Sequence, residues 1–122
     1  MNAISWVEVP VGDMNRAVRF YNTVMLWDLK ENVMGPLKMA WFPSDTAEHG
    51  AGGSLVENPH YTPSSDGALL YFQCPDVADN IGRVEEAGGQ VLRGKTFIAP
   101  NIGYMALAID TEGNRIAFHS KQ

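Results

Sequence analysis

One pattern of helix and strand signals occurs twice in the sequence, and this repeat restricts the possible folds more than any other feature. Asp13 and Asp76 each precede an amphipathic segment, and about half of the 122-residue chain lies between them. Such aspartates are typical N-caps, because the carboxylate accepts hydrogen bonds from free N–H groups of the first turn. The apolar residues at helical spacing are Met14, Ala17, Val18, Tyr21 and Met25, and then Val77, Ile81, Val84 and Ala87. The pattern predicts two helices, the second stopping at Gly88.

Each predicted helix follows one strand-like segment and precedes three more. In the first half these strands are predicted at Ile4–Val11, Trp27–Met34, Leu37–Phe42 and Gly52–Glu57. In the second half they are predicted at Ala68–Cys74, Gln90–Ile98, Ile102–Ile109 and Arg115–His119. The order βαβββ therefore occurs twice, which predicts an α+β fold of two modules, about residues 1–60 and 67–122, in one domain. One helix covers one face of each sheet, so the other face must pack against a second module, in the same chain or in another one.

The composition excludes several other classes of protein. Nine Lys and Arg residues stand against 14 Asp and Glu residues, and the resulting charge of −5 comes without any basic run. This argues against nucleic acid or an anionic membrane as a partner, since both require clustered cations. The single cysteine, Cys74, excludes a disulfide framework. Without a signal-like start or a long apolar stretch, the sequence predicts a soluble, cytoplasmic protein.

The alternation of side chains divides each predicted strand into two faces. We expect the purely apolar faces, such as Val7, Val9 and Val11, to lie under the helices, where a polar group would have no partner. The opposite, enclosed face then collects Trp6, Glu8, Leu55, Glu57, Leu69, Tyr71, Gln73, Ala117 and His119. Aromatic, carboxylate, amide and imidazole groups that converge from several strands predict a small-molecule pocket. The alternative is a polar face that is simply solvated.

Three segments resemble the vicinal oxygen chelate superfamily, which includes glyoxalase I, bleomycin-resistance proteins and extradiol dioxygenases. They are VGDMNRAVRFY from Val11 to Tyr21, the second helix from Asp76 to Gly89, and DTEGNRI from Asp110 to Ile116. The resemblance covers nearly the whole chain. It implies two βαβββ modules in an open, barrel-like mixed sheet with helices on the outer face, a homodimer, and an active site inside the sheet.

The resemblance also implies where a metal would bind. Members with metal chemistry place a His, Glu or Gln on the first and fourth strand of each module, and these positions correspond here to Trp6, Leu55, Leu69 and Ala117. An indole N–H only donates and the other three side chains are aliphatic, so none of the four binds a divalent ion. We therefore predict no metal cofactor, which argues against glyoxalase and dioxygenase chemistry.

The leading hypothesis is a glyoxalase-like protein that binds a small organic molecule in the concave face of the sheet. Trp6, Glu57, Tyr71 and Gln73 are the predicted ligand-binding residues. A non-catalytic alternative, also implied by the resemblance, is a binder that sequesters a toxic compound or an antibiotic. The acidic charge of the chain would attract a cationic drug.

Catalysis without a metal is a further possibility that the residues leave open. Glu8 would act as a general base and His119 as its acid in a lyase or isomerase proton transfer. Another alternative is a displaced metal site made by Glu8, Glu57 and His119, because zinc and manganese accept such ligands. The same residues also fit a structural polar network. His49 and His60 are predicted to be exposed loop residues, and Cys74 a buried structural thiol.

Overall fold

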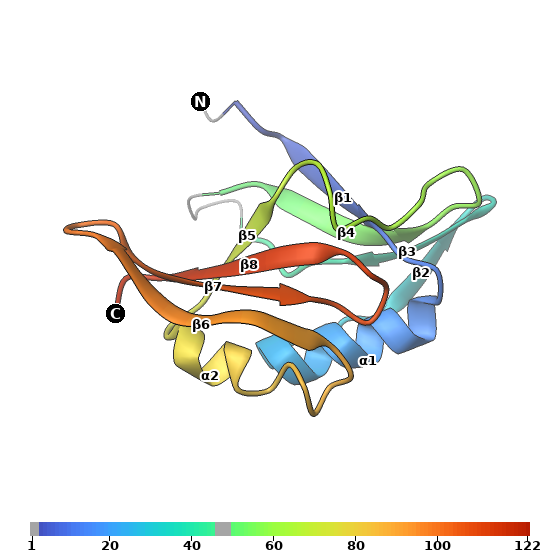
Figure 1. Ribbon diagram of the computed structural model, residues 1–122. Coiled ribbons are helices and arrows are strands. Elements are labelled where there is room, and N and C mark those ends of the chain that lie inside the picture. Colours follow the sequence, from blue (N-terminus) through green and yellow to red (C-terminus); the bar gives the residue numbers. More distant parts are fainter. Residues whose placement is uncertain (1–2, 46–49) are drawn as a thin grey trace.

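The two halves of the chain form two four-stranded sheets with both helices on one side of them (Figure 1). The computed structural model describes residues 3–45 and 50–122, apart from the side chain of Met34. The first module consists of β1 (Trp6–Pro10), α1 (Met14–Met25), β2 (Glu31–Met34), β3 (Leu37–Trp41) and β4 (Gly52–Glu57). The second consists of β5 (Leu70–Gln73), α2 (Val77–Ile81), β6 (Gln90–Ala99), β7 (Gly103–Ile109) and β8 (Arg115–Ser120). The predicted α+β fold with two βαβββ modules is confirmed.

Each sheet is mixed and open. The strand orders are β1-β4-β3-β2 and β5-β8-β7-β6, so the two modules have the same topology. The first strand of each module pairs in parallel with the fourth, and the other neighbours are antiparallel. β1 and β5 are therefore edge strands of two separate sheets, and the space between the modules lies beside them.

The two helices begin where the sequence predicts, but the second ends early. The Asp13 carboxylate accepts a hydrogen bond from the backbone N–H of Arg16 at the start of α1, and Asp76 caps α2 in the same way. We predicted a helix up to Gly88, but α2 ends at Ile81. The segment that follows consists of turns, whose backbone hydrogen bonds mostly join residues three positions apart. Glycine at position 82 explains the difference, because it lowers the stability of a continuous helix.

The helix sides of both sheets form a single hydrophobic core. Val9 and Phe118 are buried together with the apolar face of α1. The rings of Phe42 and Phe72, one from each module, lie 5.4 Å apart and perpendicular to each other. Asn80 in α2 donates a hydrogen bond to the carbonyl oxygen of Val24 in α1. The modules are therefore joined through packing on the helix side.

A buried carboxylate also links the modules. Asp110, at the end of β7, is only 3% exposed, and it accepts a hydrogen bond of 2.6 Å from the hydroxyl of Tyr21 in α1. It further accepts hydrogen bonds from the backbone N–H groups of Glu112 and Asn114 and from the Asn114 amide. Burial, and then the charge of Asp110, raise the pKa of Tyr21 well above its ordinary value, so the phenol stays protonated and donates.

Glu112, two residues after Asp110, binds the backbone at the N-terminal end of α1. Its carboxylate accepts hydrogen bonds from the backbone N–H groups of Gly12 and Asp13, at 2.9 and 2.8 Å. Arg16 binds the same carboxylate with two nitrogens, Nε at 2.7 Å and Nη2 at 2.9 Å. An acidic group of the second module thus satisfies free N–H groups at a helix start of the first.

Gly89 allows the segment after α2 to approach the core closely. A Cβ at this position would lie 2.6 Å from the carbonyl oxygen of Ile109 and 2.6 Å from a ring carbon of Phe20. Gly89→Ala is expected to lower the free energy of unfolding by about 2 kcal/mol, because the crowded atoms must move apart. Urea titration measures the change. Gly94→Ala is the control, since among the described residues no atom lies within 4 Å of its added Cβ, and an equal loss there would contradict the explanation.

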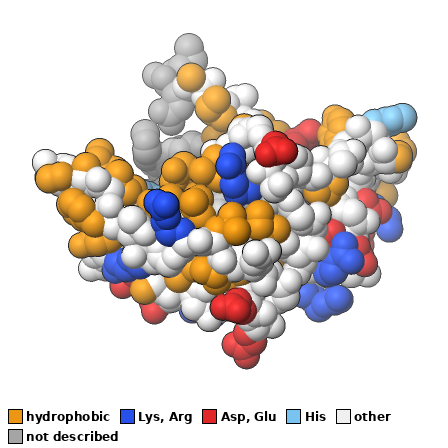
Figure 2. Space-filling view, in the orientation of Figure 1, with side chains coloured by type: hydrophobic (Ala, Val, Ile, Leu, Met, Phe, Trp, Pro, Cys, Tyr) orange, Lys and Arg blue, Asp and Glu red, His pale blue; other side chains and the backbone are white. Residues whose placement is uncertain are grey.

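At the end of the β6–β7 hairpin, Phe97, Ile98 and Ile102 are exposed, and hydrophobic side chains gather at this end of the molecule (Figure 2). Within residues 3–45 and 50–122, no helix has the length and apolar character needed to cross a membrane.

Candidate functional site

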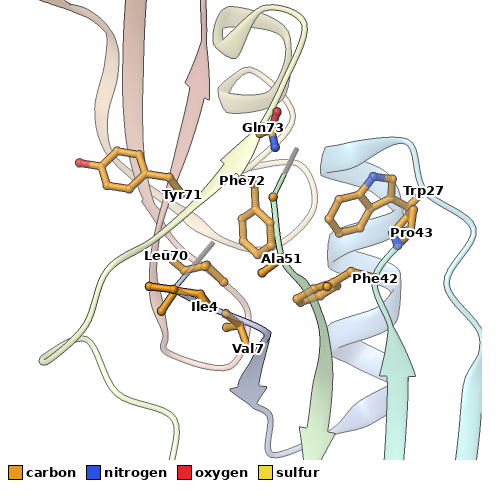
Figure 3. A pocket seen from close by; sticks show the side chains of 13 residues that line it. Ile4, Val7, Trp27, Phe42, Pro43, Ala51, Leu70, Tyr71, Phe72 and Gln73 are labelled. Carbon is orange, nitrogen blue, oxygen red and sulfur yellow. The ribbon is translucent and has the colours of Figure 1, made fainter. Parts of the chain in front are cut away.

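A cavity of about 660 Å³ lies between β1, β5 and the neighbouring ends of β3 and β4 (Figure 3). Its apolar lining comes from both modules and consists of Ile4, Val7, Trp27, Phe42, Leu70 and Phe72. The volume falls within the range of small-molecule sites in proteins, which are mostly apolar with a few polar groups. The cavity is therefore the strongest candidate for a binding site in the described part of the chain.

Three aromatic rings shape the cavity on the helix side. Trp27 lies 5.5 Å from Phe42 and 5.8 Å from Phe72, measured between ring centroids. Phe42 is held beside β4 by a hydrogen bond from its backbone N–H to the carbonyl oxygen of Gly53. A Cβ on Gly53 would lie 2.5 Å from the carbonyl oxygen of Val7 and 3.1 Å from the Phe42 ring. Glycine at this position lets β1 and the Phe42 ring pack closely.

The polar groups of the cavity lie on β5. Gln73 is at the rim, and its amide stands on the opposite side of the cavity from Val7 in Figure 3. Tyr71 lines the cavity too, but its ring points away from Phe72 (Figure 3). Of the four predicted ligand-binding residues, Tyr71 and Gln73 thus border the cavity. The aromatic residues Trp27 and Phe72 were missed, because their spacing is that of ordinary core residues.

A second groove, of about 500 Å³, runs beside β1 toward the segment before β5. Ile4, Val7 and Leu70 line both hollows. The charged residues of the groove are Glu8, Asp66 and Arg115. Among the described residues, the hollow between the modules therefore has no charged lining residue on the side of the cavity, whereas the mostly apolar groove includes three.

The register of the first sheet corrects two predicted positions. Val9 pairs with Leu55 in the parallel ladder of β1 and β4, so these side chains share the helix side of the sheet. Leu55 and, two residues on, Glu57 therefore lie on the face opposite to Glu8, whereas we predicted them on the enclosed face. The alternation was ambiguous because β4 starts with two glycines and continues with two adjacent aliphatic residues.

Glu57 makes contacts that stabilise the fold. Its carboxylate accepts a hydrogen bond of 3.0 Å from the backbone N–H of Met14, in the first turn of α1. The Nζ of Lys38 lies 3.8 Å from the same carboxylate. These contacts occupy Glu57 at the start of a helix, away from the face that we predicted for a ligand.

In the second sheet, the side chains lie on the faces that we predicted. Tyr71 pairs with Ala117 and Gln73 pairs with His119, so these four residues lie on the face away from the helices. The His119 ring nitrogen Nε2 lies 2.7 Å from the carbonyl oxygen of Ile102. Among the described residues no hydrogen bond or ion pair joins His119 to Glu8, so the acid–base pair stays a prediction.

The residues at the expected metal positions are only partly those predicted. Because Glu8 pairs with Ser54, the fourth-strand residue facing the same side as Trp6 is Ser54 rather than Leu55. Glu8 and Glu57 lie on opposite faces of one sheet, so the displaced cluster of these residues with His119 does not form. Residues 3–45 and 50–122 contain no group of three or more His, Cys, Asp or Glu side chains arranged to hold a metal ion.

Burial raises the pKa of the Cys74 thiol to about 11, so the thiol is neutral at pH 7 and a poor nucleophile. His60 is exposed, as predicted, and His49 lies outside the described residues.

Two βαβββ modules that share a core and border a cavity define a protein of the glyoxalase-like class. The chain belongs to the Glyoxalase/Bleomycin resistance protein/Dioxygenase superfamily, whose family model matches residues 3–118. This confirms the predicted membership of the vicinal oxygen chelate superfamily.

Individual relatives carry names that fit this family. A glyoxylase-like domain-containing protein from Didymella fabae is 26% identical over 117 residues, covering 91% of this chain and 88% of the relative. A glyoxalase/bleomycin resistance protein from Albidiferax ferrireducens superposes with a TM-score of 0.75 at 15% identity, covering 99% of this chain and 100% of the other. A glyoxalase I variant from Zea mays gives a TM-score of 0.73 at 20% identity, over 96% of this chain and 46% of that one. At these identities the solved structures support the fold alone.

Proposed function

We propose that this protein binds a small, largely apolar organic molecule in the cavity between its two modules. The observation that carries the proposal is the cavity itself, in which Trp27, Phe42 and Phe72 offer aromatic surface and Gln73 offers an amide at the rim. Aromatic walls favour a flat or ring-containing ligand, and the amide favours one polar group on it. The glyoxalase and bleomycin-resistance names of the relatives are compatible with a small organic ligand.

Several finer predictions from the sequence remain predictions. A metal-independent lyase or isomerase step with Glu8 and His119 is one of them, and sequestration of a toxic compound is its non-catalytic alternative. A cytoplasmic location and the homodimer are two more. The exposed apolar end of the β6–β7 hairpin supports the homodimer, because association would cover it.

The proposal is tested with N-phenyl-1-naphthylamine, a neutral aromatic dye that fluoresces in apolar sites. We expect saturable binding to the native protein and at least about tenfold weaker binding to Val7→Phe, because the added ring fills part of the cavity. Val33→Phe is the matched control, since Val33 is 69% exposed on β2. Thermal unfolding of each variant verifies that it is folded. Equal affinity of both variants and the native protein would contradict binding in the cavity.

A further inference from the structure

The edges of β1 and β5 border the same hollow between the modules without pairing. Both are edge strands of their sheets, and the structure describes both in full. No Cα atom of β1 lies within 8 Å of a Cα atom of β5. Directly paired residues of neighbouring strands have Cα atoms about 4.5–5.5 Å apart, so these edges are too far apart to form a ladder. One further strand between them requires about 10 Å, twice the ordinary spacing of strands.

Consecutive residues of both strands line this hollow. Residues 7–10 of β1 line the groove, and residues 70–73 of β5 line the cavity (Figure 3). Since side chains alternate between the two faces of a sheet, a run of consecutive residues indicates that the strand edge borders the hollow. The last residues of β1 share the groove with Leu70, the first residue of β5, whereas the last residues of β5 share the cavity with Ile4. The two edges therefore run in roughly opposite directions.

Along β1, main-chain groups of alternate residues point toward the second module. The N–H of Val11 donates a hydrogen bond of 2.9 Å to a carbonyl oxygen of β4, so the odd-numbered residues of β1 bond to β4. The N–H and C=O groups of Trp6 and Glu8 therefore point away from β4. The carbonyl oxygen of Pro10 belongs to the same alternate set, and it accepts a hydrogen bond of 2.7 Å from the Asn114 amide in the second module. This contact confirms the direction of the set.

β5 presents its edge in the same way. The N–H of Cys74 donates a hydrogen bond of 2.8 Å to a carbonyl oxygen of β8, so the N–H and C=O groups of Tyr71 point away from β8. Among the described residues, no main-chain hydrogen bond joins Trp6 or Glu8 to Tyr71 across the hollow. Strand edges with such open N–H and C=O groups pair readily with another extended chain.

We propose that the slot between the edges of β1 and β5 binds an extended peptide segment, which adds a strand between the two modules. Donors and acceptors on both walls match those of an extended main chain, and such pairing supplies the affinity in recognition by strand addition. Because the walls run in roughly opposite directions, the added strand is parallel to one and antiparallel to the other. Both existing sheets already combine the two kinds of pairing.

The two hollows beside the slot select the side chains of the peptide. The aromatic rings of the cavity favour one aromatic side chain, and in this respect the inference rests on the proposed function. The groove is lined by the carboxylates of Glu8 and Asp66 and by the guanidinium of Arg115. Among the described residues neither carboxylate forms an ion pair. The excess of negative charge favours a Lys or Arg side chain at this end of the peptide.

The probes are acetyl-Lys-Thr-Val-Phe-Thr-amide and the peptide of reverse sequence, because the segment can run in either direction. Lys and Phe are three residues apart, so their side chains point to opposite faces of an extended chain. With at least one peptide at saturating concentration, amide hydrogen exchange of Glu8 and Tyr71 is expected to slow at least about tenfold. Val9 and Phe72 are internal controls with a much smaller expected change, because their N–H groups already bond to β4 and β8.

The matched control peptide carries N-methyl groups on its Thr and Phe residues at the second and fourth positions. It keeps every side chain but lacks two main-chain donors, so it is expected to bind at least about tenfold more weakly. In the protein, Glu8→Pro removes one N–H of the slot and leaves the ladder with β4 in place. Glu8→Gln is its control, since it loses the same carboxylate and keeps the N–H. Glu8→Pro is expected to bind the peptide at least about tenfold more weakly than Glu8→Gln.

Thermal unfolding verifies that both variants are folded, and the exchange measurement on the native protein needs no variant. Unchanged exchange of Glu8 and Tyr71 at millimolar concentrations of both peptides would overturn the proposal, and so would equal binding of the N-methylated peptide. Slow exchange without peptide that becomes fast on dilution of the protein would also overturn it, because a second copy would then fill the slot. Saturable binding of N-phenyl-1-naphthylamine without any peptide protection would leave the proposed function standing without this site.

Discussion

Asp110→Ala is expected to lower the free energy of unfolding by about 3–5 kcal/mol, a large part of the stability of a domain of this size. The carboxylate is buried and accepts hydrogen bonds from the Tyr21 hydroxyl, two backbone N–H groups and the amide of Asn114. Alanine leaves the Tyr21 hydroxyl and the two backbone N–H groups without an acceptor, while the Asn114 amide keeps its hydrogen bond to the carbonyl oxygen of Pro10. Each unsatisfied buried group costs about 1–3 kcal/mol before the structure relaxes. The contact between α1 and the β7–β8 hairpin weakens at the same time.

Urea unfolding monitored by tryptophan fluorescence measures this change. Asp28→Ala is the matched control, because the Asp28 side chain is 88% exposed and its nearest cation, Lys30, is 4.0 Å away. This control is expected to change the stability by less than about 0.5 kcal/mol. A loss for Asp110→Ala as small as that of the control would show that the hydrogen bonds of Asp110 do not hold the modules together.

Glu112→Gln is expected to lower the free energy of unfolding by about 2–3 kcal/mol at pH 7, and by much less near pH 2. Burial by itself raises the pKa of Glu112, but the hydrogen bonds from Arg16, Asp13, Thr111 and Gly12 outweigh burial. They lower the pKa from 4.5 to about 2. Because the folded state binds the proton more weakly than the unfolded state, the stabilisation is complete above about pH 5. It is lost as the pH falls from there toward 2.

The measurement is a set of urea titrations of the native protein and the variant between pH 7 and pH 2. The difference in free energy of unfolding between the native protein and Glu112→Gln is expected to become smaller as the pH falls through the range from 4.5 to about 2. Glu86→Gln, at an exposed position after α2, is the control and is expected to show no such pH dependence. A difference between native protein and Glu112→Gln that stays constant with pH would exclude the ionised carboxylate as its source.

The parts of the fold that depend on residues close together in the sequence could be predicted from it. Asp13 and Asp76 mark helix starts because a cap acts on N–H groups two or three residues away. The end of α2 was misplaced, because apolar spacing continued through Val84 although Gly82 interrupts the helix. The faces of β1 and β5 were predicted correctly since their apolar and polar residues alternate. The face of β4 was wrong, because adjacent apolar residues in this strand remove the signal and its register depends on β1.

For the candidate site, the sequence indicated the class of protein and a face of the sheet, but not the cavity. Trp27, Phe42 and Phe72 are far apart in the chain and have the spacing of core residues, so only their packing across the modules reveals a hollow between them.

The sequence by itself determined the duplicated βαβββ order, the helix starts and the family, because these depend on patterns within short segments. Only the tertiary structure decided which side chains of different strands share a face, how the modules join through Asp110 and Glu112, and where the cavity lies. These depend on strand register and on the packing of distant residues, and no local pattern carries that information.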